Sequence, residues 1–155
     1  MHALLTVIAT WLSITFALPA IQDHPTVVFA SSAQMSAMQH ARLAATGQHR
    51  VGAQSLPFAL RGGGEGVFAM YDDATRTIFL HENWTGTSPA SISLLVHEMV
   101  HHLQHAAGMT FACAGEREKV AYLAQREWLR LFDRSLEKEF GLDPMTILLR
   151  TNCLH

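Results

Sequence analysis

The sequence predicts an α+β domain that is mainly helical, with a small β-hairpin or sheet beside a central helix. Apolar residues at helical spacing run from Ser91 to Ala106 and, after a break, from Gly115 to Leu131. Two short apolar runs before them have the composition of strands. The chain has 155 residues, of which 49% are hydrophobic. This length suits one domain with one core and leaves no material for a separate substrate domain.

The N-terminal segment has the pattern of an export signal. From Ala3 to Leu18 the chain is uncharged and mostly apolar, and Ala17, Pro19 and Ala20 supply small residues for cleavage. The stretch is short for a membrane span. We therefore expect a signal peptide at residues 1–20, a mature domain at 21–155, a periplasmic or secreted location, and no stable membrane association after cleavage. An uncleaved anchor is the alternative, because no Lys or Arg precedes the apolar stretch.

A packing helix is predicted from Ser32 to Ala45, with serines at its start and Gly47 after its end. The glycine-rich segment Arg61–Gly66 is predicted to be a loop. It lacks the Lys-Ser/Thr ending of a phosphate-binding loop, so it does not indicate a nucleotide site.

A β-hairpin is predicted directly before the central helix. Its strands are Val67–Tyr71 and Thr77–Leu80, and the segment between them has the composition of a turn. A strand edge beside a catalytic site can bind an extended peptide through main-chain hydrogen bonds. A hairpin that only covers the core is the alternative interpretation.

The central helix carries an H-E-x-x-H pentapeptide from His97 to His101. Residues four apart share one helix face, so both imidazoles can reach one ion while Glu98 projects beside it towards a water molecule. This is the arrangement of many catalytic zinc sites. The alternatives are a core helix with polar histidines on its wet side, or a surface metal patch that includes His102 and His105.

A third metal ligand has to come from another helix, because a catalytic zinc site takes three protein ligands. The metzincin continuation is absent, since Gln104 and Ala107 occupy the positions of its glycine and third histidine. His105 lies about 12 Å along the helix axis from His97, too far to share an ion.

The segment from Glu118 to Tyr122 resembles the gluzincin group of zinc metallopeptidases, in which a glutamate ligand in an E-x-x-A-D/Y-like setting follows H-E-x-x-H one helix later. Glu118 matches the ligand position, and Tyr122 occupies the place often taken by an aspartate that orients the first histidine. The chain is also similar to small exported bacterial zincin-like proteins with Val-His-Glu-x-Val-His-His-x-Gln sequences. The resemblance spans about Tyr71 to Trp128 and implies a zincin-like fold and hydrolytic chemistry. Glu116 is the alternative ligand, and both glutamates would also suit a helix N-terminus.

The resemblance implies a zinc-dependent metallopeptidase with Zn²⁺ on His97, His101 and Glu118. Zinc lowers the pKa of a bound water and polarises the scissile carbonyl, while Glu98 accepts the proton and passes it to the leaving amine. Tyr122, His102 and Arg117 are candidate donors to the developing oxyanion.

The expected partner is a peptide or protein substrate, and the sequence makes no prediction of oligomeric state. The net charge is −2 and the basic residues are scattered, which argues against nucleic acid. The alternative function is a non-catalytic exported metal-binding or structural protein. A third interpretation is a peptidase-like module that needs a partner for activity.

The two cysteines, Cys113 and Cys153, are predicted to form a disulfide, as an even pair does in an exported protein. The bond would tie the C-terminal segment back near the site. Two separate buried thiols are the alternative. Asp143 and Pro144 are predicted as the N-cap and first residue of a short terminal helix.

Overall fold

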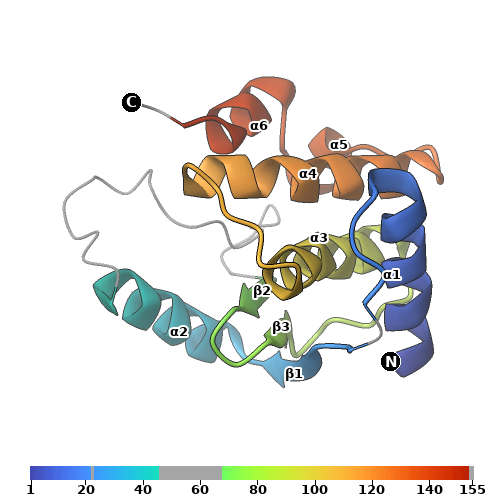
Figure 1. The fold of residues 1–155 in the computed structure, drawn as a ribbon. Coiled ribbons are helices and arrows are strands. Elements are labelled where there is room, and N and C mark those ends of the chain that lie inside the picture. Colours follow the sequence, from blue (N-terminus) through green and yellow to red (C-terminus); the bar gives the residue numbers. More distant parts are fainter. Residues whose placement is uncertain (22, 46–67, 154–155) are drawn as a thin grey trace.

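The computed structural model describes residues 1–21, 23–45 and 68–153, and the side chains of 42–45 are outside this description (Figure 1). The described chain is α+β and mostly helical, as predicted, and its small sheet is mixed. In chain order the elements are α1 (His2–Phe16), β1 (Thr26–Ala30), α2 (Ser32–Ala45), β2 (Ala69–Asp72), β3 (Thr77–His81), α3 (Pro89–Ala106), α4 (Ala114–Arg130), α5 (Leu136–Phe140) and α6 (Pro144–Thr151).

The sheet has the strand order β1-β3-β2. Strands β2 and β3 form the predicted antiparallel hairpin. Val67 at the predicted start of the first strand, the loop Arg61–Gly66 and Gly47 all lie outside the described residues. Strand β1 was not predicted, and it pairs in parallel with β3.

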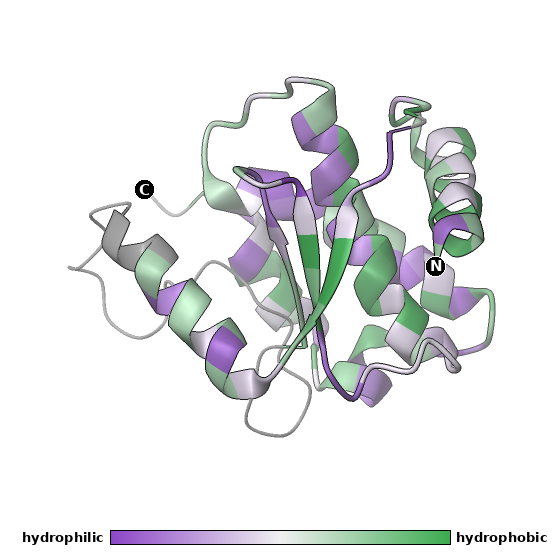
Figure 2. Ribbon diagram, turned by 90° about the horizontal axis from the view of Figure 1, so that it is seen from below, coloured by the Kyte–Doolittle hydropathy of each residue, from purple (hydrophilic) through white to green (hydrophobic). Residues whose placement is uncertain are grey.

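The two faces of the sheet pack against different helices, because side chains alternate along a strand. One face joins the main core around α3, and the other packs on α2, as the views in Figures 1 and 2 show. The register places the pairs Ala69–Leu80 and Tyr71–Ile78 in the main core, and Met70 and Phe79 with Met35 of α2. The hairpin therefore lies directly beside α3.

Helix α3 is the central element of the fold, and twelve of its residues between Ser93 and Gln104 are buried. It begins at Pro89, two residues before the predicted start at Ser91. The side chain of Ser88 accepts a hydrogen bond from the Ser91 amide, and the Ser91 hydroxyl accepts one from the Ser88 amide. This capping box, with proline in the first helical position, fixes the start of the helix.

Helix α1 packs across α3 and α4 (Figure 1). Its apolar side is buried in the main core through Leu5, Ile8 and Leu12, and the ring of Trp11 meets that of Trp128 edge to face at 5.4 Å. This helix lies within the segment predicted as a signal peptide, whose cleavage stays a prediction. Among the described helices, none combines the length and apolar character that crossing a bilayer requires.

The C-terminal helices support α4, and the predicted disulfide between Cys113 and Cys153 is present. Cys113 is the N-cap residue of α4, so the bond holds the segment after α6 against the start of that helix. A Cβ atom on Gly115 would lie 2.8 Å from the backbone oxygen of Asn152, so glycine permits this close approach. Helix α6 begins as predicted, with the Asp143 side chain accepting a hydrogen bond from a backbone amide.

Candidate metal centre

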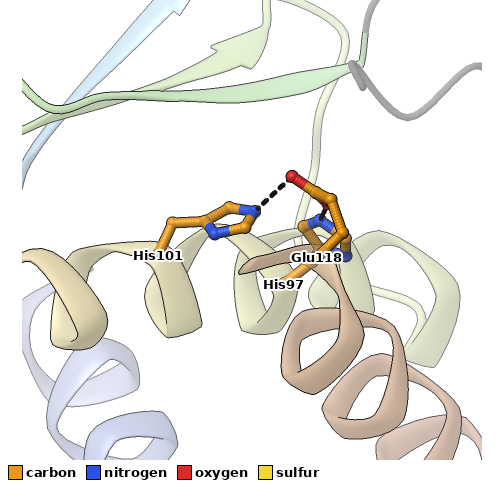
Figure 3. Close-up of side chains that lie close together, drawn as sticks. All are labelled: His97, His101 and Glu118. Atoms are coloured by element: carbon orange, nitrogen blue, oxygen red, sulfur yellow. Dashed lines mark hydrogen bonds and ion pairs between the residues drawn. The ribbon is translucent and has the colours of Figure 1, made fainter. Parts of the chain in front are cut away.

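The two histidines of the pentapeptide and Glu118 meet where α4 packs on α3. His97 and His101 lie one turn apart on α3 and are buried. The carboxylate of Glu118 reaches across from the first half of α4 (Figure 3). Its Oε2 lies 3.1 Å from Nε2 of His97, and its Oε1 lies 3.3 Å from Nε2 of His101. Ligand atoms of the three residues all lie within 4.8 Å of one another, a spacing that suits a single ion.

The alternative ligand Glu116 lies apart from this group. Its side chain is exposed, and its Oε2 accepts a hydrogen bond of 2.6 Å from the Ala112 amide. Two residues along a helix point in different directions, so the turn of α4 that aims Glu118 at the histidines turns Glu116 away. Glu116 thus accepts a hydrogen bond from a backbone amide at the start of α4, in agreement with the alternative that it suits a helix N-terminus.

The neighbouring histidines of α3 also face elsewhere. Nε2 of His102 lies 2.8 Å from the backbone oxygen of Asp23, and its Nδ1 lies 3.2 Å from the hydroxyl of Tyr71. Nδ1 of His105 lies 3.6 Å from a carboxylate oxygen of Asp73. Within the part of the chain that the structure describes, neither residue joins the group of three.

Glu98 is buried beside the group without belonging to it. It is 2% exposed, and its Oε1 has no hydrogen-bond partner among the described residues. Burial raises the pKa of Glu98 from 4.5 to about 7; His97 and a hydrogen bond from the backbone of Tyr71 oppose this rise, and the charge of Glu118 adds to it. A carboxylate with this pKa can both accept and release a proton near neutral pH.

The carboxylate of Glu118 is in the opposite electrostatic situation. Burial acts to raise its pKa, but His101 and His97 outweigh that effect and hold the pKa well below its usual range. Glu118 is therefore ionised in the folded protein, as a metal ligand must be.

The three candidate oxyanion donors have different surroundings. Tyr122 is buried with its ring centroid 4.9 Å from that of His97, and its hydroxyl accepts a hydrogen bond from Arg150. The guanidinium of Arg117 donates two hydrogen bonds, of 2.7 and 2.6 Å, to the carboxylate of Asp73. His102 is held by Tyr71 and Asp23, as described above. Of the three, Tyr122 alone has its ring against a histidine of the group.

Two glutamines that the sequence interpretation did not assign complete the surroundings of the imidazoles. Oε1 of Gln125 lies 3.2 Å from Nδ1 of His97, and Oε1 of Gln104 lies 3.1 Å from Nδ1 of His101. The sequence feature that indicates these two glutamines is their helical spacing from the candidate ligands. Gln104 follows His101 by three residues and Gln125 follows Glu118 by seven, so each glutamine shares a helix face with a candidate ligand. Gln125 thus contacts Nδ1 of His97, while Glu118 contacts Nε2 of the same ring.

Comparison with known proteins places the chain in a family without an assigned activity. A family model described as "Domain of unknown function (DUF6647)" matches residues 1–155. The chain belongs to the DUF6647 family. No curated protein and no solved structure matches it. The DUF6647 match covers every element described above, including both helices of the candidate metal centre.

Proposed function

We propose that this DUF6647 protein is a zinc-dependent metallopeptidase with a zincin-like fold. The observation that carries the proposal is the convergence of two imidazole nitrogens and one carboxylate on a single position, with a buried and unliganded glutamate beside it. Two histidines and one glutamate are a ligand set of catalytic zinc sites, which take three protein ligands. His97, His101 and Glu118 supply these three ligands.

The residues present fit zinc in this position. His97, His101 and Glu118 would hold the ion. Zinc bound there would supply a Lewis acid that lowers the pKa of water and polarises a peptide carbonyl. Glu98 accepts the proton of the attacking water at its Oε1, which has no hydrogen-bond partner among the described residues. It then passes this proton to the leaving amine.

A peptide substrate suits the position of the hairpin. Among the described strands, β2 pairs with β3 and has no strand on its other side. The backbone of Tyr71 in β2 contacts Glu98 through a hydrogen bond. An extended peptide added to this edge would run close to the proton-accepting carboxylate, held by main-chain hydrogen bonds.

Export of the protein is part of the proposal. The Cys113–Cys153 disulfide supports it, because such bonds persist in oxidising compartments. The apolar N-terminal segment is then the export signal.

The test combines zinc content with cleavage of casein, an unstructured protein substrate. We expect the purified protein to bind one zinc and to cleave casein, and the Glu98→Gln variant to keep the zinc and lose cleavage. His97→Ala and His101→Ala should lose the metal itself. Full activity in Glu98→Gln would contradict the mechanism, and zinc binding without cleavage of any peptide would favour the non-catalytic metal-binding protein.

A further inference from the structure

Gln104 has its amide orientation fixed by a backbone carbonyl. Its Nε2 lies 3.1 Å from the backbone oxygen of Arg117, which can only accept a hydrogen bond. The amide nitrogen of Gln104 is therefore on that side, and its Oε1 is the atom that faces Nδ1 of His101 at 3.1 Å. Since Oε1 only accepts, Nδ1 of His101 carries the proton.

Gln125 is oriented through the hydroxyl of Ser93. The Ser93 hydroxyl donates to the backbone oxygen of Ala90 at 2.7 Å, so its oxygen is left to accept from Nε2 of Gln125 at 3.3 Å. Oε1 of Gln125 then accepts from Nδ1 of His97. Both glutamines and Ser93 are 0% exposed. Reversing the Gln104 amide would set its oxygen against the Arg117 oxygen, and reversing the Gln125 amide would require Ser93 to give up its hydrogen bond to Ala90.

The consequence for the centre is that four electron-rich atoms, two nitrogens and two oxygens, face one another. With the protons on Nδ1, the Nε2 lone pairs of His97 and His101 point at the two oxygens of Glu118, at 3.1 and 3.3 Å. Lone pairs at that spacing repel one another unless a positive charge lies between them. The hydrogen bonds behind the imidazoles therefore favour a positive charge in front of them, which either a proton or a metal ion can supply.

The two glutamines also join the helices in both directions. Gln104 extends from α3 to the backbone of α4, and Gln125 extends from α4 to Ser93 of α3. Each amide thus orients one imidazole and also forms a hydrogen bond between α3 and α4. These bonds help to keep the two helices at the distance at which His97, His101 and Glu118 meet.

We propose that Gln104 and Gln125 are positioning residues that hold His101 and His97 in the Nδ1–H form, so that both bind a divalent cation through Nε2. This rests on the proposed metal centre. It goes beyond it by assigning the coordinating atom of each histidine and the group that selects it.

The first experiment is nuclear magnetic resonance of the zinc-loaded, full-length protein. Long-range proton–nitrogen correlations should show a proton on Nδ1 of both histidines and the metal on Nε2. Gln104→Leu should speed exchange of the His101 proton and leave that of His97 unchanged, and Gln125→Leu should do the reverse. Each variant thereby serves as the folding control for the other. Coordination through Nδ1 in the unmodified protein would overturn the proposal without any variant.

Zinc affinity, measured by competition with a chelator, supplies the second readout. Loss of a hydrogen bond behind a histidine ligand typically weakens binding about 10–100-fold, and we expect this for both leucine variants. Gln125→Glu should bind zinc as the unmodified protein does, because the Ser93 hydroxyl can turn to donate to a carboxylate. Gln104→Glu should bind weakly, because the Arg117 carbonyl cannot donate.

The positioning role of the two glutamines would be overturned if both glutamate variants bound zinc with the same affinity. Unchanged zinc affinity in the leucine variants would also overturn it. Zinc binding with the expected Nδ1–H signals but no peptide hydrolysis would overturn the proposed peptidase activity and leave this inference standing. Failure of the unmodified protein to bind zinc would overturn both.

Discussion

Replacing Glu98 with glutamine is expected to stabilise the metal-free protein at neutral and alkaline pH. The carboxylate is 2% exposed, and one of its oxygens lacks a partner among the described residues. An ionised group in that position costs folding free energy, which a neutral amide of the same shape avoids. If Glu98 serves catalysis, the protein tolerates this cost for function.

The magnitude follows from the pKa of Glu98, which is 4.5 ordinarily and about 7 in the folded protein. At about 1.4 kcal/mol per pKa unit, this difference corresponds to about 3 kcal/mol. The folded state keeps a proton that the unfolded chain has already released between these two values. The cost is therefore absent below pH 4.5, grows as the pH rises, and is complete above about pH 7.

The assay is equilibrium unfolding by urea in the presence of a chelator, at about pH 8 and at about pH 4. The free energy of unfolding of Glu98→Gln should exceed that of the unmodified protein by about 3 kcal/mol at pH 8, and the two values should be equal at pH 4. Glu82→Gln, at an exposed carboxylate after β3, is the matched control and should change stability by less than about 0.5 kcal/mol at either pH. Equal free energies of unfolding for Glu98→Gln and the unmodified protein at both pH values would show that the buried carboxylate carries no such cost.

Three further predictions concern the metal ligand Glu118, the disulfide, and the close contact between Gly115 and the backbone of Asn152. Glu118→Gln should weaken zinc binding by at least about 10-fold while Glu116→Gln leaves it unchanged, as measured by chelator competition; the reverse order would make Glu116 the ligand. Replacing Cys113 and Cys153 by serine should lower the free energy of unfolding by about 4 kcal/mol for a 40-residue separation, and a loss below about 1 kcal/mol would contradict this. Gly115→Ala usually favours a helix by about 0.5–1 kcal/mol, but here the new methyl group meets backbone, so thermal unfolding should show a lower Tm rather than a higher one.

The sequence predicts the elements whose information is local. The apolar spacing of α3 and α4 and the turn between β2 and β3 depend on near neighbours in the chain, and the structure agrees with those predictions within about two residues. Helix α3 begins two residues before the predicted start, because the capping box of Ser88 and Ser91 and the proline at position 89 set its first turn there.

Strand β1 escaped prediction for a physical reason. It has five residues from Thr26 to Ala30, and its partner β3 lies far along the chain. Short apolar segments do not reveal a parallel pairing of this kind, because the pairing depends on tertiary contacts rather than on periodicity.

The candidate site shows the same division between local and distant information. His97, Glu98 and His101 follow from one motif on one helix. The choice of Glu118 over Glu116 depends on how α4 packs against α3, and in the sequence only the resemblance to gluzincins favours Glu118. The glutamines required the structure, because hydrogen bonds to Ser93 and to the Arg117 backbone determine which atom each amide presents.

The measurement that tests the metal centre most directly is a crystal structure of the zinc-soaked protein with anomalous scattering recorded at the zinc absorption edge. We expect one peak bound by Nε2 of His97, Nε2 of His101 and the carboxylate of Glu118, with zinc–nitrogen distances of about 2.0–2.1 Å. An anomalous peak elsewhere, or none between α3 and α4, would contradict the account.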